Sequence, residues 1–146
     1  MRSTVLRSSL RIAAILACII TSILTSSAQE TVRHTIRHDG MEREYWLYLP
    51  SGMKEKAPLV ILMHGYGGKA EGYRPEMIAV AEENGFALCY PQGAVDGKGK
   101  TCWNVGYPFQ KDLKTDDVDF ICTLTRHLQK KYDLSRENTF CTGMSN

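Results

Sequence analysis

The feature that most constrains the fold is a run of five apolar residues, Leu59–Met63, between Pro58 and a glycine-rich segment. A strand that is apolar on both faces is typical of a parallel sheet covered on both sides. Apolar residues at helical spacing follow over 71–84 and end at Asn84-Gly85, a helix stop signal. A second short apolar run occupies 86–90. The order strand, helix, strand predicts a parallel sheet with crossover helices, and therefore an α/β fold.

The segments on either side of this unit have patterns of their own. Residues 31–49 alternate between apolar and polar side chains around Asp39-Gly40, which predicts an antiparallel hairpin. Residues 91–115 are irregular, and a connection this long in a compact domain is usually functional or disordered. A helix is predicted over 115–132, where acidic residues open the pattern and two lysines close it. A final strand is expected at 139–142.

Residues 1–28 have the pattern of a secretory signal peptide. Three arginines and no acidic residue precede an apolar run at 12–24, and small residues follow up to Ala28. The run is shorter than the about 20 residues that span a membrane. We therefore expect cleavage near Ala28, a secreted or periplasmic location and no stable membrane anchor. The alternatives are a retained anchor and lipidation at Cys18, although Cys18 lies inside the apolar run rather than after it.

The remaining part, 29–146, is expected to be a partial α/β domain. It has 15 basic and 16 acidic side chains, and the basic ones are dispersed, so nothing predicts nucleic-acid binding. No two cysteines have the Cys-x-x-Cys spacing of a metal site, and none is predicted. Disulfides are permitted in an exported protein, but the pairing stays open among the cysteines of this part: Cys89, Cys102, Cys122 and Cys141.

The chemistry is concentrated in two glycine-containing segments that each follow an expected strand. Gly143-Met144-Ser145-Asn146 begins a Gly-x-Ser-x-Gly nucleophile elbow, in which a sharp turn exposes the serine, so Ser145 is the candidate nucleophile. One oxyanion donor is then the backbone N–H of Asn146. The segment 64–68 can supply the second donor, which we assign to Tyr66, with Gly67 next. The other members of this loop are expected to support it: His64, Gly65 and Gly68.

The four histidines all precede the serine, whereas in this arrangement the order along the chain is serine, acid, histidine. We therefore expect the acid and the base after residue 146, and a chain that is the front half of its domain and inactive by itself. His34 and His38 are expected to be solvated, and His64 to support the oxyanion loop rather than act as base. Helix-start capping accounts for three carboxylates: Asp116, Asp117 and Asp119.

Taken together, the motifs resemble those of the secreted polyhydroxybutyrate depolymerase and feruloyl esterase group of α/β-hydrolases. The segments that carry the resemblance are 62–68, 90–93, 102–104, 116–121, 132–136 and 142–146. The resemblance implies the N-terminal half of an α/β-hydrolase fold, an exported carboxylic ester hydrolase, an acyl-enzyme on Ser145 and no cofactor. It also implies that the strand 139–142 pairs with 59–63 and, in this chain, leaves a bare apolar edge.

The substrate is less constrained by the sequence. An aromatic loop that contains Trp103, Asn104 and Tyr107 could line a substrate pocket or could be a structural cluster over the sheet. The expected substrates are plant-wall feruloyl or acetyl esters, or short polyesters. A peptidase of the same fold and a non-catalytic carbohydrate-binding protein are the alternatives.

Overall fold

The computed structural model describes residues 30–71 and 74–146. The predicted signal peptide, its cleavage site and Cys18 lie outside the described residues. In the part that is described, no helix is long and apolar enough to cross a membrane.

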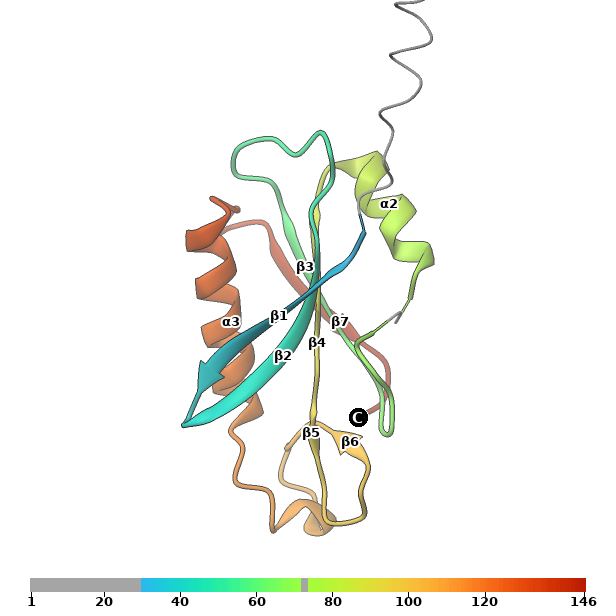
Figure 1. Ribbon diagram of the computed structural model, residues 1–146, viewed down its shortest axis with the longest axis vertical. Helices are drawn as coiled ribbons and strands as arrows, with labels where there is room; N and C mark the ends of the chain where they lie inside the picture. The colour runs from blue at the N-terminus through green and yellow to red at the C-terminus, as the bar shows by residue number, and fades with distance from the viewer. Residues whose placement is uncertain (1–29, 72–73) are drawn as a thin grey trace, which may run out of the picture.

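The core of the structure is a five-stranded sheet with the order β1-β2-β4-β3-β7 (Figure 1). A short hairpin of β5 and β6 lies beside it. The strands are β1 (Val32–His38), β2 (Met41–Tyr48), β3 (Leu59–Met63), β4 (Ala87–Pro91), β5 (Ala94–Val95), β6 (Thr101–Cys102) and β7 (Thr139–Gly143).

The strand pairing confirms the predicted topology. The hairpin β1-β2 is antiparallel and turns at Asp39 and Gly40, which both have positive φ angles. β3 is parallel to β4 on one side and to β7 on the other, so that Ile61 pairs with both Cys89 and Cys141. β3 is therefore the inner strand that holds β7 in register.

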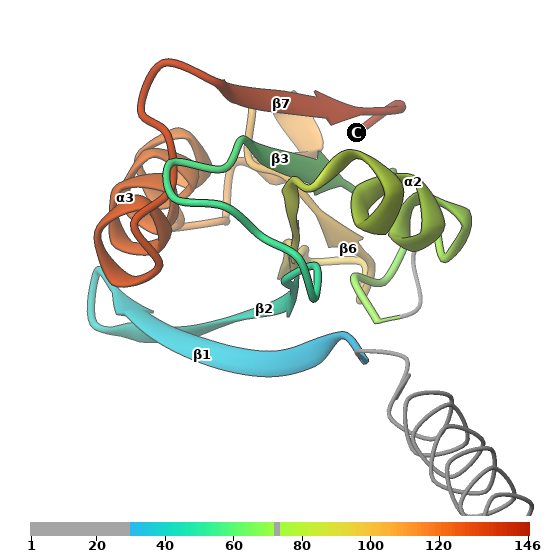
Figure 2. The ribbon, with the colours of Figure 1, turned by 90° about the horizontal axis from the view of Figure 1, so that it is seen from above.

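Two helices cover opposite faces of the sheet, as Figure 2 shows. The helix α2 (Glu76–Asn84) begins five residues later than the start of the predicted pattern and ends at Gly85, whose φ of 69° closes the helix as expected. The helix α3 (Asp117–Lys131) begins after Asp116, whose side chain accepts a hydrogen bond from the backbone N–H of Asp119. A single 3₁₀ turn, Pro108–Gln110, lies in the irregular segment.

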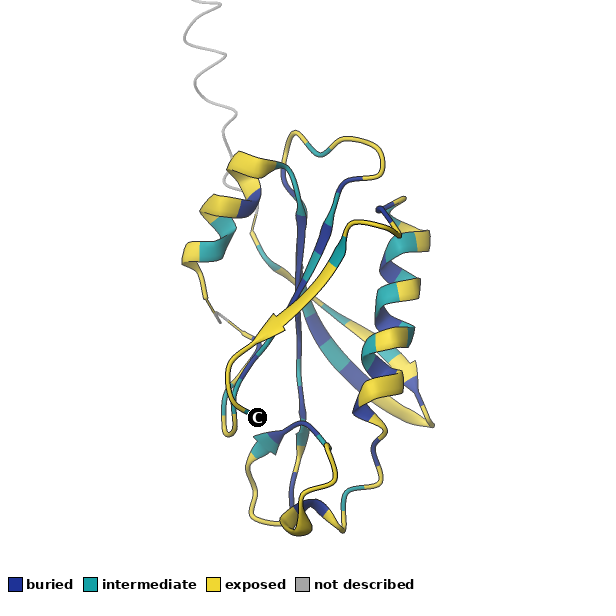
Figure 3. Ribbon diagram, turned by 180° about the vertical axis from the view of Figure 1, so that it is seen from behind, coloured by how far each residue is buried: buried dark blue, intermediate teal, exposed yellow. Residues whose placement is uncertain are grey.

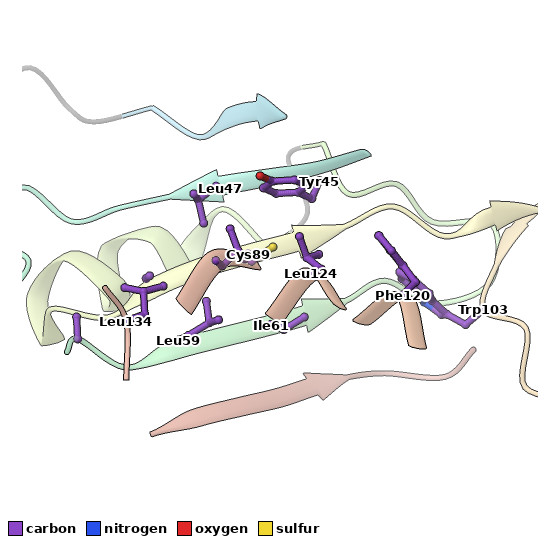
Figure 4. Packing of buried hydrophobic residues seen from close by; sticks show 12 residues of the cluster. Tyr45, Leu47, Leu59, Ile61, Cys89, Trp103, Phe120, Leu124 and Leu134 are labelled. Atoms are coloured by element: carbon purple, nitrogen blue, oxygen red, sulfur yellow. The ribbon is translucent and has the colours of Figure 1, made fainter. Parts of the chain in front are cut away.

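The apolar side chains divide into one cluster for each face. On the α3 face, Phe120, Leu124 and Leu128 pack against Leu59 and Ile61 (Figure 4). On the α2 face, Ala81 packs with Leu62 and Leu88 among others. Two apolar side chains of these helices lie outside the clusters: Val80 is 42% exposed and Val118 is 68% exposed.

Charged groups inside the fold depart from the sequence-based expectation. Of the three carboxylates, only Asp116 caps the helix. Asp117 is buried and pairs with Arg43 of β2 at 2.7 Å, and the Arg43 guanidinium lies 3.9 Å from the centre of the Phe120 ring. Asp119 accepts a hydrogen bond from the buried His38 at 2.9 Å, so the prediction that His38 is solvated is wrong. The helix α3 covers the hairpin that carries His38, and no local sequence pattern predicts this contact.

The outer edge of β7 has no strand beside it among the described residues, and most of the strand is exposed (Figure 3). Phe140 is 57% exposed on this edge strand. An uncovered apolar strand edge favours association, and the bare edge matches the expectation from the sequence.

Arg43→Ala in the whole protein should lower the free energy of unfolding by roughly 3–5 kcal/mol, because Asp117 is left charged and buried without its partner. Urea unfolding measures the change. Arg126→Ala is the matched control, since Arg126 is exposed and lies 3.8 Å from Asp119, and it should cost under about 1 kcal/mol. Equal losses in the two variants would contradict a structural role for the buried pair.

Candidate active site

Ser145 occupies a strained turn directly after β7. Its φ angle is +66°, in the left-handed region that few non-glycine residues adopt, and it is exposed. A nucleophile elbow holds its serine in a strained turn of this kind, directly after a strand. In the described part of the chain, no hydrogen bond engages its hydroxyl.

Two glycines allow the turn to approach the end of β3. A Cβ atom on Gly143 would lie 2.9 Å from the carbonyl oxygen of Met63, and a Cβ on Gly65 would lie 2.9 Å from that of Met144. Real Cβ atoms essentially never come this close to a backbone oxygen. The absence of side chains at both positions therefore brings the segment 64–68 against the serine turn.

The backbone N–H groups around Ser145 are not equally available. The N–H of Gly67 donates to the carbonyl oxygen of Thr101 at 2.7 Å, and that of Gly68 donates to Gly65 at 2.9 Å. The N–H groups of Tyr66 and Asn146 have no partner within the described residues. The sequence reasoning that kept Gly67 as a second choice for the oxyanion donor is thus corrected, because its N–H is already bonded.

The side chain of Asn146 fixes the turn to a loop far away in the sequence. Its Oδ1 accepts from the N–H of Trp103 at 3.1 Å, and its Nδ2 donates to the carbonyl oxygen of Trp103 at 2.9 Å. The indole N–H of Trp103 donates in turn to the carbonyl oxygen of His64 at 2.7 Å. Trp103 therefore connects the two segments of the site, a role that the sequence reasoning missed because it considered this residue only as pocket lining or as part of an aromatic cluster over the sheet.

His64 is buried and both of its ring nitrogens are engaged. Nε2 accepts from the N–H of Gly93 at 3.0 Å and lies 2.9 Å from the side-chain nitrogen of Gln92. Nδ1 therefore carries the proton, which it donates to the carbonyl oxygen of Gly65 at 2.8 Å. Burial lowers the pKa of His64, and the bond to Gly65 opposes that shift only in part. The ring is a neutral connector between β4 and the loop 64–68.

The side chain of Tyr66 leans away from the serine toward the β5-β6 hairpin. Its hydroxyl donates to Oδ2 of Asp96 at 2.7 Å, and the other oxygen of Asp96 accepts from the N–H groups of Lys98 and Lys100. The hydrogen bond to Asp96 raises the pKa of Tyr66 to about 12. The bonds from Lys100 and Tyr66 lower the pKa of Asp96, so a charged carboxylate positions the phenol.

A cavity of about 470 Å³ opens beside Ser145 between β7 and the start of α3. Trp103 and Asn104 line it, as the sequence predicts for a pocket, whereas Tyr107 does not. Tyr107 stacks on Phe109 instead, with ring centres 5.5 Å apart, and Phe109 meets Tyr66 edge to face. Within the described residues, no group of three His, Cys, Asp or Glu side chains is placed to hold a metal ion.

A family model described as esterase PHB depolymerase matches residues 43–146. The chain belongs to this family.

A protein of Nocardia uniformis subsp. tsuyamanensis that carries the name esterase NocK is 30% identical over 114 residues, which are 73% of this chain and 31% of that protein. A protein of Aspergillus clavatus named probable acetylxylan esterase A is 25% identical, over 68% of this chain and 32% of the relative. The chain thus spans about a third of the length of these relatives.

Solved structures show the same fold. The acetyl xylan esterase from Aspergillus awamori matches with a TM-score of 0.61 at 18% identity, over 77% of this chain and 42% of that one. A bacterial heroin esterase matches with a TM-score of 0.60 at 17% identity, over 89% of this chain and 40% of that one. The described part is accordingly a portion of an α/β-hydrolase fold, as predicted.

Gly143→Ala should lower the free energy of unfolding by roughly 1–3 kcal/mol, because the new methyl group meets the carbonyl oxygen of Met63 and β7 must shift. Gly52→Ala is the control, since a Cβ there meets nothing within 4 Å. Denaturant unfolding of both variants of the whole protein measures the difference. A Gly143 variant as stable as the Gly52 variant would show that the close approach is not required.

The imidazole of His64 should stay neutral with Nδ1 protonated, and its pKa in the folded protein should lie below the 6.5 of a free histidine. Because the unfolded state then binds the proton more readily, this residue makes stability fall as the pH drops below about 6.5. Nuclear magnetic resonance titration of the ring, with the urea-unfolded protein as reference, measures which nitrogen is protonated and the pKa of His64. Titration of His64 at or above its unfolded value would contradict the assignment.

Proposed function

We propose that the whole protein is a serine-dependent carboxylic ester hydrolase in which Ser145 attacks the ester carbonyl and forms an acyl-enzyme. The observation that carries this proposal is the left-handed turn at Ser145, held against a loop that presents an unbonded N–H. The strained turn keeps the hydroxyl exposed at the end of β7. Membership of the esterase family supports the reaction class.

In this proposal the negative oxygen of the tetrahedral intermediate is bound by the N–H groups of Tyr66 and Asn146. Both lack a partner within the described residues, and Gly65 brings the first within reach of the serine turn. One such donor stabilises the transition state by roughly 3–4 kcal/mol. His64, Gly65 and Gly68 act as support for the loop, through the ring contacts and the turn described above.

The general base in this proposal is a histidine that follows Asn146 in the whole protein, held by a carboxylate that also follows it. His64 is unsuited to the task, because the lone pair on its Nε2 already accepts from Gly93. A free lone pair is what a base needs to take the proton from the serine hydroxyl.

The proposed substrates are acetyl or feruloyl esters of plant-wall polysaccharide, or short polyesters, met after export from the cell. Relatives that carry the name acetylxylan esterase support the ester class. The exposed rings of Tyr66, Tyr107 and Phe109 form one contiguous aromatic cluster near the loop 64–68. Such rings suit contact with a sugar or a phenolic acyl group.

Ser145→Ala in the whole protein should lower kcat for p-nitrophenyl acetate by at least about 10³-fold, because the nucleophile is lost while the fold stays intact. It should also prevent labelling by a fluorophosphonate probe. Steady-state kinetics and mass spectrometry of the labelled protein measure the two effects.

Ser51→Ala is the matched control, since this exposed serine contacts Glu82 and lies on the loop after β2. It should keep both activity and labelling. An active Ser145→Ala protein would remove Ser145 from the mechanism, and cleavage of peptides but not of esters by the wild-type protein would favour a peptidase of this fold.

A further inference from the structure

Two cysteines from different elements line the same cavity. Cys122 is on α3 and Cys141 is on β7, and both line the 470 Å³ opening beside the serine turn. Both side chains are exposed and both are free thiols in this structure. Neither has a part in the proposed ester hydrolysis.

A hydrogen bond between α3 and β7 fixes how the two elements that carry these cysteines lie against each other. Gln129 of α3 donates a hydrogen bond to the hydroxyl of Thr139 at the start of β7, at 2.9 Å. Cys122 is seven residues before Gln129, so it lies on the same helix face about 10 Å toward the helix start. Cys141 is two residues after Thr139, on the same strand face and about 7 Å further along.

The sheet register places the Cys141 side chain on the face that α3 covers. Cys141 pairs with Ile61, whose side chain packs in the cluster formed with Leu124 of α3. Neighbouring residues in a sheet that are directly paired point to the same face. Burial raises the pKa of Cys141, and the nearby Cys122 raises it further, as expected for two thiols in proximity.

The other cysteines are not placed to compete. Cys89 also pairs with Ile61, on the opposite side of β3 from Cys141. The two are therefore two strand spacings apart, about 9–10 Å, which exceeds the roughly 4.4–6.8 Å between Cα atoms of a disulfide. Cys102 is buried in β6, opposite Ala94.

We propose that Cys122 and Cys141 form a disulfide that covalently ties α3 to the strand that delivers Ser145. The bridge closes a loop that contains the second half of α3 and the connection to β7, and it constrains the exposed edge strand. A cross-link of this kind stabilises the folded state mainly by restricting the unfolded chain.

The reaction is a thiol–disulfide exchange with a small disulfide such as oxidised glutathione. The thiolate of Cys122 attacks one glutathione sulfur, and the released glutathione thiolate takes up a proton. The thiolate of Cys141 then attacks the Cys122 sulfur of the mixed disulfide and displaces the second glutathione, which is protonated in turn. Two cysteine sulfurs are oxidised and two glutathione sulfurs are reduced.

The test is peptide mapping of the whole protein after equilibration with oxidised glutathione, alkylation of the remaining thiols and digestion with trypsin. Cleavage after Lys114, Arg126 and Arg136 separates the two cysteines. The expected product is peptide 115–126 joined to the peptide that begins at Glu137, with two hydrogens fewer than the sum of both. Dithiothreitol should release the two peptides.

Cys122→Ser and Cys141→Ser should each eliminate the joined peptide and leave the partner cysteine alkylated or joined to glutathione. Cys102→Ala is the matched control and should keep the link, with far-ultraviolet circular dichroism to verify folding. Hydrogen exchange of the β7 amides should be slower in the oxidised than in the reduced wild-type protein. Recovery of both peptides singly alkylated after oxidation, or joined to other cysteines, would overturn the proposal.

Discussion

The close contact between the backbone at Gly65 and the backbone at Met144 is the constraint on which the site depends. A Cβ at position 65 would lie 2.9 Å from the Met144 carbonyl oxygen, so only glycine permits the approach. The parallel pairing of β3 with β7 brings the ends of both strands to the same edge of the sheet. The unbonded N–H of Tyr66 and the strained serine turn meet there as a consequence of this register.

A continuous series of polar contacts connects the serine turn to the core of the fold. Arg43 of β2 pairs with Asp117, which also accepts from the N–H of Asn104 at 2.6 Å. The preceding residue, Trp103, is bonded at both backbone groups by the side chain of Asn146. Each member is buried or partly buried, and buried polar groups without partners are costly. The irregular loop is thus held rigid where it contacts the serine turn.

The sequence predicts the strands of the main sheet, the helix order and the two glycine segments, because these follow from apolar periodicity and turn chemistry within short windows. It did not predict the short hairpin of β5 and β6, which lies in the segment described as irregular. Contacts between distant residues leave no such local signal. The partner of Asp117 is 74 positions away, and that of His38 is 81 positions away. For the same reason, the sequence left Trp103 open between a substrate pocket and a structural cluster, and it did not predict the two hydrogen bonds to Asn146. The hydrogen bond from the N–H of Gly67 to the carbonyl oxygen of Thr101 likewise has no local signal in the sequence.

The central claim is that Ser145 and the N–H groups of Tyr66 and Asn146 form one reactive centre. A crystal structure of the whole protein after inhibition by a small alkyl phosphonate tests it most directly. The account predicts a covalent bond from Ser145 to phosphorus and a phosphoryl oxygen within hydrogen-bond distance of both N–H groups. An adduct on another residue, or an oxygen bound by neither N–H group, would contradict it.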